Sequence, residues 1–209
     1  MKAKILRIIK SKWFIAGSCL LLGAAIILGV RFYSYNVNAI HYHANFALYV
    51  NGRREPFKGI QYYTEVEMCT QENTVLPSER AHMHDNVNDV VHVEDHAVTW
   101  GQFFANLGWT LGPTFIASPD GTIYAENGDS KLYLILNGQD YTDFGGLQNA
   151  VIKDEDKLLV SFGGETTAQV EQQYKTVPST AAKFDTSKDP ASCSGNHTTS
   201  MHDRLTHLF

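Results

Sequence analysis

The sequence predicts an α+β protein in which one N-terminal transmembrane helix precedes a mixed β-sheet domain with one main helix packed on the sheet. Three observations lead to this class. Trp13 to Val30 is an unbroken apolar run with only Gly, Ser and Cys as interruptions. Ile40 to Val50 alternates between apolar and polar residues, as a half-buried strand does. A capped helix is expected to begin at Thr99, and strand-like segments follow it.

The N-terminal segment has the length and charge pattern of a membrane anchor. At 1.5 Å per residue, its roughly 18 apolar residues are just enough to cross a bilayer core. The residues before the run include no acidic side chain and five basic ones, Lys2, Lys4, Arg7, Lys10 and Lys12. Because positive charges stay on the cytoplasmic side, we expect a single-pass cell-membrane protein with a cytoplasmic N-terminus and an extracytoplasmic C-terminal domain.

Two other kinds of N-terminal segment share part of this pattern. A cleaved signal peptide has a shorter apolar core and a small-residue cleavage site, whereas this run ends in Val30-Arg31-Phe32-Tyr33. A lipoprotein signal would place its modified cysteine after the run, but Cys19 lies near the start of it. The sequence therefore favours an uncleaved anchor, with the lipid bilayer as a partner.

The anchor divides the chain into four predicted regions. They are a basic cytoplasmic leader at 1–12, the anchor at 13–31, an extracytoplasmic His-rich domain at 36–176 and a polar C-terminal tail at 177–209. The exported part is long enough for one core and too short to predict two. The net charge is −5 although the leader is basic, so the exported part is acidic. This argues against nucleic acid as a partner and leaves any protein partner unassigned.

Two cysteines, Cys69 and Cys193, lie in the exported part. In an oxidising compartment such a pair is most simply a disulfide, which here would tie the tail to the body of the domain. Two free thiols are the alternative. The sequence contains no CxxC motif, so it gives no support for thiol–disulfide exchange.

Turn and capping signals predict the remaining elements. The first strand ends at Asn51-Gly52, and Thr99 with Gln102 forms a capping box for a helix that Gly108 ends. Between Arg53 and Asp89 the chain is expected to be irregular, apart from a strand-like patch at Ile60 to Met68. Further strands are expected at 90–93, 114–117, 122–125, 132–136 and 157–162, and a last helix at 167–175.

Two segments carry a resemblance to a known superfold. They are Leu132-Tyr-Leu-Ile-Leu-Asn-Gly138 and Val151-Ile-Lys-Asp-Glu-Asp-Lys-Leu-Leu-Val160. This ending, after two strands and a helix, resembles the β-grasp or ubiquitin-like fold over roughly 40–164, with a long insertion after the first strand. The His-x-His-Ala and Val-His-Val patterns are also similar to those of an uncharacterised family of exported, membrane-anchored His-rich proteins of archaea and bacteria. The resemblance implies a topology and brings no activity.

The histidines carry the prediction of function, and none of them lies in the leader or the apolar run. Six fall in three short motifs, His41-Tyr42-His43, His82-Met83-His84-Asp85 and His92-Val93-Glu94-Asp95-His96. Residues two apart on a strand point the same way. If the first two strands pair, imidazoles from both therefore meet on one face, and the second motif is expected to close the shell from a loop.

This arrangement predicts a metal site, because neutral imidazole is the commonest zinc ligand and also suits copper. The candidate ligands are His41, His43, His84 and His92, followed by His82, His96 and Glu94. The expected cofactor is a zinc or copper ion. Copper is included because thioethers such as that of Met83 are soft ligands that bind it. The plainer alternative is that these are ordinary polar residues on an exposed sheet face. The tail histidines, His197, His202 and His207, either bind metal loosely or belong to a solvated terminus.

Three functions remain open from the sequence. The leading one is a membrane-anchored extracytoplasmic metal-binding domain that acts as a carrier, a sensor or a structurally metallated module. The second is a metal-dependent hydrolase or hydratase in which a metal-activated water reacts and Glu94 serves as general base. The third is a metal-free adhesion or protein-interaction module. No nucleophile elbow and no phosphate-binding glycine loop occurs in the sequence, so no catalytic residue is assigned.

Overall fold

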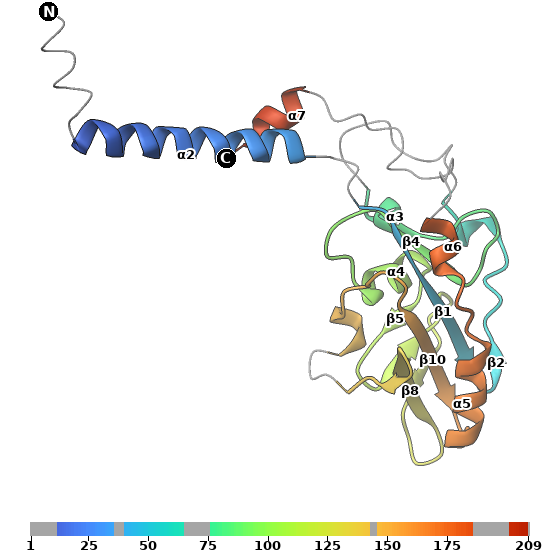
Figure 1. Ribbon diagram of the computed structural model, residues 1–209. Coiled ribbons are helices and arrows are strands. Elements are labelled where there is room, and N and C mark those ends of the chain that lie inside the picture. The colour runs from blue at the N-terminus through green and yellow to red at the C-terminus, as the bar shows by residue number, and fades with distance from the viewer. Residues whose placement is uncertain (1–11, 36–39, 65–75, 143–145, 186–200, 209) are drawn as a thin grey trace, which may run out of the picture. The chain divides into compact units, whose positions relative to one another are not determined.

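The computed structural model describes residues 12–35, 40–64, 76–142, 146–185 and 201–208 (Figure 1). The chain forms two units, one of Met1–Ala39 with Thr198–Phe209 and one of Ile40–His197.

The first unit is built on helix α2, Lys12–Ser34, which confirms the predicted N-terminal apolar helix. With 23 residues, α2 is long enough and apolar enough to cross a membrane. A signal sequence can also have this length and hydropathy. The short helix α7, Met201–Thr206, lies against the C-terminal end of α2. There the Arg204 guanidinium donates hydrogen bonds to two backbone carbonyls of the last turn of α2.

The second unit is built on a mixed sheet with strand β1, Tyr42–Val50, at its centre. On one side of β1 runs β4, Val90–Val93, which is antiparallel to it, and on the other side runs β10, Lys157–Gly163, which is parallel. The order across the sheet is β3 (Ala81–His82), β4, β1, β10, β8 (Lys131–Leu136) and β9 (Gln139–Asp140), with β2 (Arg53–Arg54) also paired to β1. A smaller sheet contains β5 (Thr110–Leu111), β6 (Phe115–Ala117) and β7 (Ile123–Ala125). The mixed α+β class is therefore confirmed.

The main helices form where the sequence predicts them. Helix α4, Trp100–Asn106, begins at Thr99, whose hydroxyl accepts a hydrogen bond from the Gln102 amide while the Gln102 side chain accepts one from the Thr99 amide. Helix α5, Thr167–Thr176, starts with the same reciprocal pair of contacts at Thr166. The shorter helices are α3 (Pro77–Arg80) and α6 (Ala181–Asp185), with 3₁₀ turns η1 (Ile60–Tyr62) and η3 (Leu147–Asn149).

The two faces of β1 pack against different layers. Ala44, Phe46 and Leu48 point into the main core, where the Phe46 and Phe103 rings meet edge to face at 4.8 Å. On the opposite face, Ala47 and Tyr49 pack with apolar residues of α5 and of the neighbouring strands. This alternation is the one that the sequence predicts for β1, and it leaves the N-terminal half of the second face to the histidines.

The region from Arg53 to Asp89 differs from the expectation of irregular chain. Its described parts, 53–64 and 76–89, contain β2, α3 and β3. The predicted strand-like patch begins as the 3₁₀ turn η1, followed by a bridge from Tyr63 to Met83, and its residues 65–68 lie outside the described residues. A two-residue strand such as β3 has no periodic signal, because its conformation comes from pairing with β4. Cys69 and Cys193 both lie outside the described residues, so their disulfide stays a prediction.

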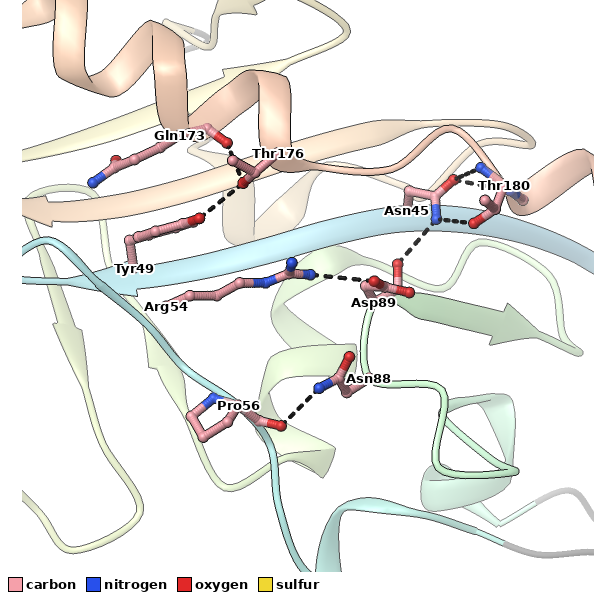
Figure 2. A network of polar contacts seen from close by, with 10 residues as sticks. Asn45, Tyr49, Arg54, Pro56, Asn88, Asp89, Gln173, Thr176 and Thr180 are labelled. Atoms are coloured by element: carbon pink, nitrogen blue, oxygen red, sulfur yellow. Dashed lines mark hydrogen bonds and ion pairs between the residues drawn. The ribbon is translucent and has the colours of Figure 1, made fainter.

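The chain beyond Thr176, predicted as a polar tail, continues over the sheet as far as Asp185. Its attachment is the buried side chain of Asn45 (Figure 2). The Asn45 carbonyl oxygen accepts hydrogen bonds from the amides of Thr180 and Ala181 at 2.8 and 2.9 Å. Its amide nitrogen donates to the Thr180 hydroxyl and to the Asp89 carbonyl. One side chain of β1 therefore anchors the start of α6.

Replacement of Asn45 tests this attachment. Asn45→Ala leaves the partly buried amide of Thr180, the buried amide of Ala181 and the Asp89 carbonyl without their Asn45 partner, so we expect it to lower the free energy of unfolding by about 2–3 kcal/mol. Asn88 provides the matched control, since its side chain makes one hydrogen bond, to the Pro56 carbonyl at the surface. Asn88→Ala should cost about 0.5–1 kcal/mol. Urea unfolding measures both, and equal losses would contradict the role given to Asn45.

Candidate metal centre

A row of three histidines crosses three neighbouring strands. In the register of the sheet His43 of β1 pairs with His92 of β4, and His92 pairs in turn with His82 of β3. Directly opposed residues of antiparallel strands project from the same face. The sequence predicts a shared histidine face if the first two strands pair; the pairing of β1 with β4 is confirmed, and it brings imidazoles from distant parts of the chain together.

Three more side chains lie two positions from members of this row. They are His41, His84 and Glu94. The Nε2 atom of His41 lies 4.0 Å from a carboxylate oxygen of Glu94. The ring of His84 approaches that of His92 with 3.7 Å between centroids. We call the resulting set the histidine face, and its members are His41, His43, His82, His84, His92 and Glu94.

The histidine face is largely closed to solvent. His43 and His92 are fully buried, and His82, His84 and Glu94 expose 6% or less of their surface. The His41 side chain is the most open, at 22%. These values exclude the alternative that the histidines are ordinary polar residues on an exposed sheet face. Buried imidazoles need polar partners that compensate for the loss of water.

His96 stands apart from the face. It is exposed in the turn after β4, where its amide donates to Asp95 and its carbonyl accepts from Arg80. His202 and His207 belong to the α2–α7 unit, and His197 lies outside the described residues.

Three of the imidazoles have the spacing of a metal site. One nitrogen from each of His41, His43 and His92 lies within 4.8 Å of the other two. A point within about 2.8 Å of all three therefore exists, and shifts of less than about 1 Å bring each nitrogen to the 2.0–2.1 Å of a zinc–imidazole bond. We refer to His41, His43 and His92 as the histidine triad.

A hydrogen-bonded chain orients His92 from behind. The Nδ1 atom of His84 lies 2.9 Å from the Asp85 carboxylate, which accepts only, so the proton is assigned to this nitrogen. The Nε2 atom of His84 then accepts from His92 Nδ1 at 2.9 Å. The His92 ring then carries its proton on Nδ1 and its lone pair on Nε2, and a neutral imidazole of either tautomer can ligate a metal.

The contact of His43 with His92 belongs to the same network. Its Nε2 atom lies 2.8 Å from His92 Nδ1, so His43 and His84 share one donor. On the far side of the row, His82 donates through Nδ1 to the Glu79 carbonyl at 3.1 Å. Partners of this kind fix ring orientation around metal sites, so His84 and His82 are suited to supporting the triad.

His92 is held in its neutral form. Burial, followed by the nearby His84, His43, His82 and His41 side chains, lowers the pKa of His92 far below its ordinary value of 6.5. A neutral ring offers a lone pair at physiological pH, whereas a protonated ring offers none. His92 is therefore in the protonation state that a metal ligand requires.

Two residues that shape this face were not found from the sequence. Phe184 of α6 places its ring 5.6 Å from His43 and 5.7 Å from His92, and Asn45 attaches the helix that carries it. Both are separated from their partners by roughly 90 to 140 positions, so no local pattern links them.

One expectation about the surrounding elements is corrected. The second histidine motif was expected on a loop, but His82 lies within β3, where it pairs with His92. Met83, between the two histidines, points into the main core on the other side of the sheet. Its thioether is therefore not part of the histidine face.

The low pKa of His92 predicts a dependence of stability on pH. In the unfolded chain the His92 ring takes up a proton near pH 6.5, whereas in the folded protein it stays neutral. The contribution of His92 to the free energy of unfolding is therefore greatest above this pH, and the folded protein loses stability as the pH falls below it. For one histidine of this kind, the free energy of unfolding falls by about 2 kcal/mol between pH 7 and pH 5. Urea unfolding of the chelator-treated protein across this range measures the slope.

Two variants test whether the His92 ring causes this dependence of the free energy of unfolding on pH. His92→Gln should flatten it, and the exposed control His96→Gln should leave it unchanged. Equal slopes in the wild type and in His92→Gln would contradict the assignment.

Comparisons with protein-family models, with curated proteins and with solved structures give no match for this chain.

Proposed function

We propose that this chain is a membrane-anchored, extracytoplasmic metal-binding protein in which the histidine triad holds one divalent ion. The observation that carries the proposal is the approach of three triad nitrogens to within 4.8 Å of one another on a buried sheet face. Imidazoles brought this close lose their contact with water, and a shared cation compensates for that loss. Glu94, and His84 after a small shift, are the candidates for a fourth ligand.

The donor set favours zinc. The ligand atoms of the histidine face are imidazole nitrogens and carboxylate oxygens, the combination that suits borderline divalent ions. The thioether of Met83 faces the opposite core, which weakens the case for a soft copper(I) site. Copper(II) remains the rival ion, because imidazole binds it strongly.

The proposed setting of the site rests on α2. A helix of 23 residues with this hydropathy suits a single-pass anchor, and the basic leader supports a cytoplasmic N-terminus. The hydrogen bonds from Arg204 to the end of α2 favour an anchor that stays attached, since cleavage would remove both acceptors.

We infer a β-grasp topology for the second unit. The support is the strand order, in which the first and last long strands lie parallel at the centre and the second long strand flanks the first. Helix α4 follows the second long strand and fills the main core. Membership in the family of exported His-rich proteins stays a prediction.

Metal analysis tests the proposed function. Full-length protein is purified in detergent without a His tag and incubated with zinc or with copper(II) in separate samples. We expect the zinc sample to retain about one equivalent of zinc after dialysis. The double variant His43→Ala/His92→Ala should retain none, because it removes two of the three ligands. Inductively coupled plasma mass spectrometry gives the metal content.

Two single variants keep this test independent of folding. His41→Ala changes the most exposed triad member and should weaken zinc binding by about 100-fold while the fold is retained. His96→Ala changes an exposed histidine outside the face and should have no effect. Wild-type protein that retains neither ion would overturn the proposal and leave an anchored interaction domain.

A second function, metal-dependent hydrolysis or hydration, is favoured by the position of Glu94. Its carboxylate is buried 4.0 Å from Nε2 of His41, the triad member nearest to solvent. A carboxylate in that place is suited to take a proton from a metal-bound water. The binding proposal and this one differ in whether the ion keeps an open position.

Substitution of Glu94 separates the two functions. If the protein is an enzyme, Glu94→Gln should lower ester hydrolysis or CO₂ hydration by the zinc-loaded protein by about 100-fold or more while the zinc content is unchanged. If the site only binds metal, neither the wild type nor Glu94→Gln should exceed free zinc in these assays. The first result would replace the binding proposal with the enzymatic one.

A further inference from the structure

The C-terminal end of α2 is completed by a segment from the far end of the sequence. The last turn of a helix leaves backbone carbonyls without helical partners. The Arg204 guanidinium donates to the carbonyls of Phe32 and Tyr33, at 2.7 and 3.1 Å. It also lies over the Phe32 ring, 5.8 Å from its centroid. A cation at this position is stabilised further by the negative end of the helix dipole.

A second contact fixes the same segment one turn further on. The ring of His207 stacks on that of Tyr35, with 4.6 Å between centroids and 16° between planes. Arg204 and His207 are three residues apart, so they leave α7 and its following turn on the same side. This side of the C-terminal segment is therefore held against the end of α2 by two independent contacts.

The other side of the segment is apolar. Met201 and Leu205 are 68% and 54% exposed, and the partly buried Leu208 follows three residues later. Met201 and Leu205 are four residues apart on α7, so their side chains form an apolar stripe on one face of the helix, and Leu208 follows just beyond the end of α7. Apolar stripes of this kind, on a short segment with polar residues opposite, are typical of chain that lies on a membrane surface.

The location of the stripe identifies its partner. Phe32, Tyr33 and Tyr35 form the aromatic group that marks the boundary between the apolar core and the headgroups when α2 spans a bilayer. Tyr33 is 82% exposed, as a ring that contacts lipid would be. A segment hydrogen-bonded to Phe32 and Tyr33 lies at this same depth, where acyl chains and headgroups meet.

We propose that residues 201–208 form a second membrane contact, in which Met201, Leu205 and Leu208 enter the lipid interface beside the end of α2. The partner is the bilayer itself, in the leaflet that α2 reaches at its C-terminal end. The inference rests on the membrane anchor of the proposed function. Its consequence is that the metal-binding domain is tethered to the membrane through both of its ends.

Photo-crosslinking of the full-length chain in nanodiscs tests this contact. A diazirine amino acid replaces Leu205 in one preparation, Leu21 within α2 in a second and Ile123, an exposed residue of β7, in a third. The nanodiscs contain phosphatidylcholine and phosphatidylglycerol, and mass spectrometry counts the lipid adducts. We expect position 205 to give about tenfold more lipid adduct than position 123, and Arg204→Ala to reduce the yield at 205 severalfold.

The control at position 21 separates the two proposals. Lipid adducts at 21, with a yield at 205 no higher than at 123, would overturn the second contact and leave the anchor in place. Adducts at 205 formed with protein in place of lipid would also overturn it. An absence of adducts at 21 would overturn the anchor and the inference that rests on it.

Discussion

The antiparallel pairing of β1 with β4 is the constraint on which the rest of this domain depends. It sets His43 opposite His92, and the next pairing sets His92 opposite His82. A shift of one residue in this register would turn Phe46 away from the core and the histidines toward it. The large apolar residues of the main core therefore fix the positions of the imidazoles on the other face.

The histidine face is chemically unusual because its burial is so complete. Burial, together with the imidazoles that crowd around His92, lowers its pKa, so this central ring is neutral. Asp85 and Glu79 hold the outer rings from behind, and Phe184 covers the row from α6. Orienting partners and an apolar cover are the features that surround protein metal sites in general.

The two faces of the sheet are built for different purposes. On the main core side, α4 and the aromatic residues around Phe46 form the larger of the two apolar clusters. On the other side, the histidines occupy the N-terminal half and α5 the C-terminal half, and Asn45 marks the boundary between them. Since α6 depends on the hydrogen bonds of Asn45, the cover of the histidine face is attached separately from the core.

The sequence by itself determined the elements that carry strong local signals. The apolar run of α2, the alternation of β1 and the capping box at Thr99 each act over a few residues, and each predicted its element correctly. The histidine motifs predicted that His41, His43 and His92 come together, but they did not predict that His82 lies in β3 or that His96 is exposed. Only the tertiary structure decided which histidines meet. The two-residue strand β3, the removal of Met83 from the face and the exposure of His96 all follow from strand pairing. The roles of Asn45 and Phe184 arise in the same way, because contacts across more than ninety residues leave no periodicity in the chain.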